Sequence, residues 1–438
     1  MYTLNSTKGC SFTNLSTLDL SAQLRGSAFL EPIFEHETPL PKFPKLTHVR
    51  LACISPEELP PSVFPALRTI YIYFPQDRIR LQGISRPPSL RMSNMLSLLS
   101  RTPQLEHLTL DEAIPILDVR LVPSHIPGMT LSFGTRRSRR TNTHVQPIKM
   151  SCLNAFSWYH CPPKDLWRFF HFVSLTHLQT LHLLVDPFTF RWQGEREGEM
   201  FDMETTTPLS DHPISTLVVK LPNLENLVLE FSDIEGLTTC FRKFLVPSLK
   251  TLSLAYTPPK YLMDYNLVPD LPTPESIFRD PPMPTLSALT ISNLNLDLKN
   301  VLSLLGYTPS LRSLSLEGCI GVTSLVTSLG ARGLNSWICP KLDSLTFIKC
   351  DDLEPNYLNK LILHRNTASE MLTDAQPTGR PLKPLRRRTI KPLTDSSNVF
   401  ADARNLPPSR IKSIRVEGCK RVHDWDLDSQ TVSSYVLY

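Results

Sequence analysis

The segments MLSLLSRTPQLEHLTL (95–110) and VLSLLGYTPSLRSLSL (301–316) are two copies of one pattern, and this pattern decides the fold. They lie far apart in the chain, yet they are identical at nine of sixteen positions without a gap. Each joins apolar residues at helical spacing to a short phrase that reads apolar, two residues, apolar, one residue, apolar. Recurrence of such a unit along a chain is typical of repeat architectures.

The apolar phrase occurs twelve times in the 438 residues. Eight copies carry proline two residues before the first apolar residue, and four carry cysteine three residues after the last one. These shared flanking positions indicate a true repeat rather than a chance excess of leucine. The copies begin at Leu15, Leu46, Leu67, Leu105, Leu153, Leu178, Leu224, Leu249, Leu286, Leu311, Leu342 and Ile411.

The second and third apolar residues of each phrase predict a short strand, because alternate side chains of a strand point to one face. The proline ends any preceding helix and favours an extended residue before it. Strands that alternate with helices imply a parallel sheet, and units this small must stack to bury their apolar faces. Helices are expected within 94–99, 165–172, 237–245, 298–305 and 325–337.

The predicted fold is therefore an α/β solenoid, with a curved parallel β-sheet inside, helices outside, and irregular repeats with long loop insertions. We expect a single solenoid over residues 1–438, with a disordered insertion at 366–408. The tail at 421–438 is expected to cover one end of the stack. Two substitutions test this register. Leu314→Ala should lower the free energy of unfolding by about 2–5 kcal/mol, whereas Thr308→Ala, outside the phrase, should lower it much less.

The phrase in its L-x-x-L-x-L-x-x-C form resembles the leucine-rich repeat family. The irregular unit lengths, the cysteine at the turn and the R-T-P-x-L and Y-T-P-x-L strings are similar to fungal F-box proteins of the basidiomycete type. That resemblance implies that the repeats form the substrate-receptor half of an F-box-type ubiquitin ligase. No F-box is found before the first phrase at Leu15, so a ligase adaptor is expected as a partner only if an F-box lies upstream.

Composition and motifs disfavour catalysis, cofactors and membranes. Forty prolines against fifteen glycines, without a G-x-G-x-x-G or Walker-type string, disfavour a glycine-dependent phosphate site. No H-E-x-x-H or G-x-S-x-G string occurs, and no apolar run is long enough for a transmembrane helix. Nine cysteines without a C-x-x-C pair favour reduced thiols. We expect no enzyme, no cofactor, no bound metal and no membrane contact, and a monomer in the cytoplasm or the nucleus.

Two arginine-rich segments, 136–140 and 383–391, suggest an alternative function. They could make the chain a nucleic-acid-associated protein, because arginine neutralises backbone phosphates, or they could serve nuclear import. The simpler interpretation is that both are solvated basic loops. The net charge is only +5, and no aromatic residues are interleaved for base stacking. Nucleic acid is therefore the second choice of partner.

The first choice is a protein partner that binds the concave face of the sheet. Residues between the apolar positions of a phrase point away from the core and are free to make contacts. Tyrosine is a frequent interface anchor, because it covers a large area at low entropic cost. The alternative is an ordinary solvated sheet face. The predicted contact residues are Arg50, Tyr71, Tyr73, His107, Asp111, Tyr159, His182, Glu230, Glu317 and Arg415, and the best cluster comprises the three tyrosines and two histidines.

Overall fold

The computed structural model of the chain is an α/β fold that divides into two compact units. Unit 1 comprises Met1–Pro247 and Pro258–Met263, and unit 2 comprises Ser248–Thr257 and Asp264–Tyr438. The expectation of one continuous array through both units stays a prediction. The structure describes residues 13–21, 43–56, 59, 61–74, 90–113, 121–123, 143–145, 147–161, 166, 169–170, 172–186, 218–258, 268–331, 337–373, 408–422 and 434–437.

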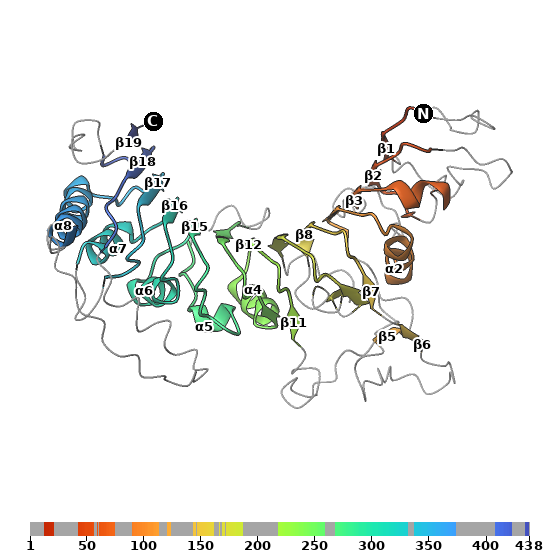
Figure 1. Cartoon of the computed structure of the whole chain (residues 1–438), viewed down its shortest axis with the longest axis horizontal. Coiled ribbons are helices and arrows are strands. Elements are labelled where there is room, and N and C mark those ends of the chain that lie inside the picture. Colours follow the sequence, from red (N-terminus) through yellow and green to blue (C-terminus); the bar gives the residue numbers. More distant parts are fainter. Residues whose placement is uncertain are drawn as a thin grey trace, which may run out of the picture. The chain divides into compact units, whose positions relative to one another are not determined.

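Parallel strands form the main sheet of unit 1 (Figure 1). Their order in the sheet follows their order in the chain, and each strand pairs with the next in parallel. The strands are β1 (Thr17–Ser21), β2 (His48–Ala52), β3 (Thr69–Tyr73), β4 (His107–Asp111), β8 (Ala155–Cys161), β10 (Thr180–Val185) and β12 (Asn226–Phe231).

Unit 2 has a sheet of the same kind, again parallel and again in chain order. Its strands are β14 (Thr251–Tyr256), β15 (Ala288–Ser292), β16 (Ser313–Glu317), β17 (Ser344–Ile348), β18 (Ser413–Glu417) and β19 (Ser434–Leu437). The last strand lies within the C-terminal tail and pairs with β18, so the tail adds one strand to this end of the sheet.

The apolar phrases form these strands, which confirms the predicted parallel sheet. Each of the twelve phrases supplies one strand, and the second and third apolar residues of neighbouring phrases are in register. In unit 2, for example, Leu314 is paired with Leu289 on one side and Leu345 on the other, and all three are at most 1% exposed. Alternation along a strand puts these residues on one face, where stacking removes them from water.

Short helices connect the strands, and in unit 2 they lie along one side of the sheet (Figure 1). The described helices are η4 (Pro61–Ala66), α2 (Met92–Arg101), α4 (Ile234–Phe241), α5 (Pro274–Ile277), α6 (Leu298–Gly306), α7 (Val322–Leu329) and α8 (Pro355–Thr373). None of these combines the length and the apolar composition needed to cross a lipid bilayer. Three small parallel sheets pair β5 (Leu121–Pro123) with β6 (Thr143–Val145), β7 (Ile148–Lys149) with β9 (Val173–Ser174), and β11 (Val219–Lys220) with β13 (Phe244–Leu245).

Several predicted boundaries are wrong. The helix expected at 237–245 ends at Phe241, because Phe244–Leu245 pairs with β11. The helix expected at 325–337 ends at Leu329, before Gly330. Residues 366–373, the first part of the expected insertion, instead complete α8, and Asn366 is buried. The rest of that expected insertion, residues 374–407, lies outside the described residues.

Thr308 lies outside the phrase but inside the packed part of the unit, which changes the small effect expected of Thr308→Ala. Thr308 is fully buried, and its hydroxyl donates to the Leu305 carbonyl oxygen at 3.1 Å. Thr102 is its counterpart in the other aligned segment, equally buried, with its hydroxyl 3.1 Å from the Leu98 carbonyl oxygen. The shared Thr-Pro pair therefore caps the end of a helix inside the core, and Thr308→Ala is expected to cost about 1–2 kcal/mol for the lost buried hydrogen bond.

A left-handed residue ends many of the strands. It lies two positions after the third apolar residue, and its φ is between 50° and 63°. It turns the next residue into the core, where the thiols of Cys319 and Cys350 donate to the carbonyl oxygens of Ile291 and Leu316 at 3.3 and 3.5 Å. The left-handed residues at this position are Cys53, Glu112, His160, Asn293, Gly318, Lys349 and Gly418.

Candidate partner-binding face

Polar and aromatic side chains cross the solvent-facing side of the unit 1 sheet in two rows, which together we call the unit 1 face. One row occupies the position between the second and third apolar residues of each phrase, and the other follows the third apolar residue. The strand register makes the members of each row neighbours. The first row is Asp19, Arg50, Tyr71, Thr109, Ser157, His182 and Val228; the second includes Ala52, Tyr73, Asp111, Tyr159, Leu184 and Glu230.

Strands β1 to β4 carry a connected set of contacts centred on Tyr71. Arg50 Nη1 lies 3.4 Å from Asp19 Oδ2, and the Arg50 guanidinium carbon lies 5.1 Å from the centre of the Tyr71 ring. The Tyr71 hydroxyl donates to Asp111 Oδ2 at 2.5 Å. Burial, together with the hydrogen bond to Asp111 and its negative charge, raises the pKa of Tyr71 above its ordinary value, while the Arg50 charge opposes this. The ring is thus held in one orientation with its proton in place.

A second set of contacts joins β8, β10 and β12. Tyr159 and His182 meet edge to face with ring centres 4.8 Å apart, and the Tyr159 hydroxyl lies 3.2 Å from His182 Nδ1. His182 Nε2 lies 2.7 Å from Glu230 Oε1. One arrangement satisfies all three groups: the tyrosine donates to Nδ1, and Nε2–H donates to the carboxylate. The histidine and the glutamate stay 23% and 30% exposed, so the set is ordered yet open to solvent.

A third polar group lies at the carboxyl ends of the same strands. Asp186 Oδ2 lies 3.3 Å from His160 Nδ1, and Asp186 Oδ1 accepts from the Ser232 hydroxyl at 3.0 Å. Nucleophilic catalysis by serine needs the histidine next to the hydroxyl, with the carboxylate behind it. Here the carboxylate lies between the two, so Asp186 orders the turn and does not activate Ser232. Sequence reasoning missed this group, although two of its members, Asp186 and Ser232, share the repeat position three after the last apolar residue.

The charged groups of β4, β8, β10 and β12 are of one sign, apart from histidine. Among the described residues of these strands and of the turns directly after them there is no lysine or arginine. The carboxylates there are Asp111, Glu112, Asp186, Glu230 and Asp233. Two of them, Asp111 and Glu230, belong to the unit 1 face, so the described charged groups of these strands on that face, apart from histidine, are negative.

The structure brings together eight of the ten predicted contact residues, all in unit 1. Arg50, Tyr71, Asp111, Tyr159, His182 and Glu230 take part in the contacts above; Tyr73 is half-buried beside Asp111, and His107 is exposed between Thr69 and Ala155. The remaining two, Glu317 and Arg415, belong to unit 2, on strands separated by β17. Arg415 Nη2 pairs with Glu417 at 2.6 Å, a neighbour the prediction did not include. The basic segments 136–140 and 383–391 lie outside the described residues.

No metal centre is found within the described parts of the chain, where no three His, Cys, Asp or Glu side chains converge. Free thiols are present at Cys53, Cys152, Cys161, Cys319, Cys339, Cys350 and Cys419. The sequence matches no family model and no curated protein.

Proposed function

We propose that this protein is a non-enzymatic recognition solenoid of the leucine-rich-repeat type, and that it binds a partner protein on the unit 1 face. The observation that carries the proposal is the ordering of Tyr71, Tyr159 and His182 by their contacts on neighbouring strands. Anchors already fixed in one rotamer lose little entropy when a partner binds. Aromatic anchors on a rigid sheet therefore suit tight protein binding.

The repeat type is supported by the unit itself. Each unit runs from the apolar phrase through a strand, followed in seven units by a left-handed turn, to a connection that returns the chain to the next parallel strand. Such units contact mainly their neighbours and leave one sheet face free. Extended faces of this kind are the usual binding surfaces of repeat proteins.

The charge of the unit 1 face supports a partner that presents lysine or arginine. The carboxylates of Asp111 in β4 and Glu230 in β12 would attract such a partner and set its orientation, whereas a nucleic acid would be repelled there. Tyr73 and Tyr159 lie beside Asp111 in register, so a cationic side chain would meet rings as well as a carboxylate.

The similarity to fungal F-box proteins supports a more specific role. In that role the bound partner would be a substrate presented for ubiquitination, and a ligase adaptor would bind through an F-box outside this sequence. Co-purification of the protein expressed from its own gene with a ligase adaptor tests this role. If a partner were recovered without any adaptor, the protein would be a stand-alone scaffold and not a ligase receptor.

Affinity purification with mass spectrometry tests the binding face itself. The chain carrying Tyr159→Ala and His182→Ala should lose its main partner, while its unfolding midpoint stays near that of the wild type. The matched control carries Ser253→Ala and Thr290→Ala on the sheet of unit 2, and it should keep the partner. Equal recovery with both variants would contradict binding at the unit 1 face.

A further inference from the structure

Three cysteines occupy the same turn position after β16, β17 and β18: Cys319, Cys350 and Cys419. The register of β17 and β18 continues into this turn, since the Lys349 backbone N–H donates to the Glu417 carbonyl oxygen at 2.7 Å. One step further, the Cys350 backbone N–H donates to the Cys419 sulfur at 3.3 Å. The last two thiols are therefore direct neighbours across the sheet, although they lie 69 residues apart in the chain.

This placement suits a covalent link. Paired strands run about 4.8 Å apart, and cysteines joined by a disulfide have Cα atoms about 4.4–6.8 Å apart. Both residues carry free thiols and lie at equivalent positions of adjacent parallel strands. The backbone N–H of Cys350 already lies 3.3 Å from the Cys419 sulfur.

The surroundings give the two thiols different roles. Hydrogen bonds from Cys350, through its side chain and its backbone N–H, lower the pKa of Cys419, although burial opposes this. The Cys350 thiol donates to the carbonyl oxygens of Ile348 and Leu316 at 3.4 and 3.5 Å, and the pKa of Cys350 is raised, because it shares its proton with Cys419 and because it is buried. The Cys419 sulfur accepts the Cys350 backbone N–H, which favours a thiolate there, and Cys419 is 6% exposed whereas Cys350 is fully buried. We therefore assign Cys419 as the nucleophile and Cys350 as the resolving thiol.

We propose that Cys350 and Cys419 form a redox-sensitive pair that hydrogen peroxide converts to an intramolecular disulfide. The Cys419 thiolate attacks one peroxide oxygen, the O–O bond breaks, and hydroxide leaves, which gives a sulfenic acid at Cys419. The Cys350 sulfur then attacks the Cys419 sulfur and breaks the S–O bond. The departing hydroxide takes the Cys350 proton. Two thiols are oxidised, and one peroxide is reduced to two waters.

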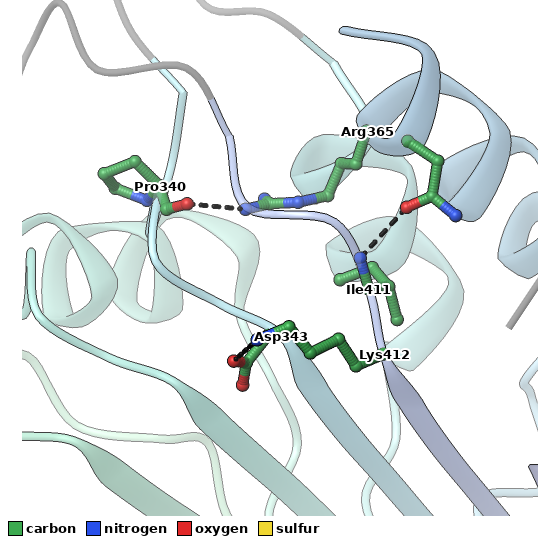
Figure 2. Close-up of polar contacts among 6 residues, drawn as sticks. Pro340, Asp343, Arg365, Ile411 and Lys412 are labelled. Atoms are coloured by element: carbon green, nitrogen blue, oxygen red, sulfur yellow. Dashed lines mark hydrogen bonds and ion pairs between the residues drawn. The ribbon is translucent and has the colours of Figure 1, made fainter. Parts of the chain in front are cut away.

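The disulfide would secure the part of unit 2 that non-covalent contacts now hold. Figure 2 shows these contacts: Arg365 of α8 donates to the Pro340 carbonyl oxygen, Asn366 accepts from the Ile411 backbone N–H at 2.9 Å, and Lys412 pairs with Asp343 at 3.3 Å. Together they attach the start of the twelfth phrase to α8 and to the chain before β17. A bond between residues 350 and 419 would fasten β18 to β17 even when these contacts open.

Mass spectrometry of the full chain tests the pair. The protein is treated with hydrogen peroxide, remaining thiols are alkylated under denaturing conditions, and the digest is analysed without reductant. We expect a linked peptide that contains Cys350 and Cys419, and a higher unfolding midpoint that returns to its original value after reduction. Both effects should be absent from Cys350→Ser and from Cys419→Ser, and Cys319→Ser should keep them.

A second measurement keeps the proposal falsifiable if a variant fails to fold. In the wild-type protein, iodoacetamide labelling of Cys419 should begin at lower pH than labelling of Cys319, whose pKa burial raises to about 11. Absence of the linked peptide, a link between Cys319 and Cys350 instead, or accumulation of the sulfinic acid at Cys419 would each overturn the proposal.

Discussion

The sheets of units 1 and 2 share their buried side but differ on their solvent-facing side. On both, leucine and other large apolar residues at the second and third phrase positions are stacked in register and removed from water. The solvent-facing positions of unit 1 include tyrosine, histidine, arginine and carboxylates beside smaller residues such as Thr109 and Ser157. Those of unit 2 are mostly small hydroxylated residues: Thr251, Ser253, Thr290, Ser313, Ser315, Ser344, Thr346 and Ser413.

This difference separates the residues that make the fold from those available for function. Stacking dictates the buried positions, because a polar residue there would lose its water contacts without gaining a partner. Nothing in the stack dictates the solvent-facing positions. Large aromatic side chains at those positions of unit 1, held by polar contacts with neighbouring strands, are not a folding requirement, and the proposed binding surface rests on them.

The largest predicted effect tests whether the buried sides are equivalent. Leu110→Ala in β4 and Leu314→Ala in β16 should each lower the free energy of unfolding by about 2–5 kcal/mol, because each leaves a cavity in a packed stack. Thr109→Ala and Ser315→Ala are matched controls one residue away, and each should change it by less than about 0.5 kcal/mol. Urea unfolding followed by circular dichroism measures all four. If the leucine substitution lowered the free energy of unfolding strongly in one unit and not in the other, the buried sides of the two sheets would not be equivalent.

The next effect concerns a glycine that unit 2 requires. Gly321 precedes α7 with φ = 84°, and a Cβ atom there would lie 2.8 Å from the Leu296 carbonyl oxygen. Gly321→Ala should therefore lower the free energy of unfolding by about 1–3 kcal/mol, since backbone must move and an unfavourable φ is kept. Gly306→Ala is the control, because nothing lies within 4 Å of a Cβ atom at the end of α6. It should be neutral or slightly stabilising in the same assay.

The strands could be predicted from sequence because their signal is local. A period of two in the apolar residues fixes which side chains are buried, whatever the insertion between phrases. The buried Arg365 could not be predicted in this way. Arginine in a helix normally faces solvent, but this one is fully buried and donates to the Cys339 carbonyl oxygen at 2.8 Å, while burial lowers its pKa to about 10. Its role depends on how α8 packs, which no local pattern contains.

The solvent-facing positions of unit 1 could be predicted from the sequence, but the contacts among their side chains could not. Alternation identified Tyr71, Asp111, His182 and Glu230 as solvent-facing. Which of them touch depends on the register between phrases, and His182 and Glu230 are 48 residues apart in the chain. The left-handed turn position was missed because glycine occupies it in only two of the seven turns where it is seen, so its sequence signal is weak.

A smaller effect separates the two units at alkaline pH. The raised pKa of Tyr71 means that the folded chain holds this proton above about pH 10, where an unfolded tyrosine loses it. Its contribution to stability is therefore complete below about pH 10 and is lost as pH rises through the folded pKa. Tyr71→Phe should make the decline of stability above pH 10 shallower, at a cost near neutral pH of about 1 kcal/mol or less.

Tyr307 in unit 2 is the matched control for this alkaline effect. Its pKa is raised through a 2.7 Å hydrogen bond to Glu275, but this hydrogen bond is exposed to solvent, whereas that of Tyr71 is partly buried. Tyr307→Phe should therefore change the alkaline decline less. Urea unfolding at pH 9 and 10.5, with tyrosinate absorbance to count the titrating groups, distinguishes the two. If both substitutions changed the alkaline decline of stability equally, the contacts around Tyr71 would stabilise its protonated form no more than an exposed hydrogen bond does.

The smallest effect uses the turn position that both units share. Lys349 is exposed and left-handed, with φ = 52°. Because glycine adopts this conformation without strain, Lys349→Gly should raise the free energy of unfolding by about 0.5–1 kcal/mol. His160→Gly relieves the same strain in unit 1 but removes the 3.3 Å contact to Asp186, so its net change should be zero or negative. Urea unfolding of both variants measures these changes. If His160→Gly raised the free energy of unfolding as much as Lys349→Gly does, the contact between His160 and Asp186 would not stabilise the unit 1 turn.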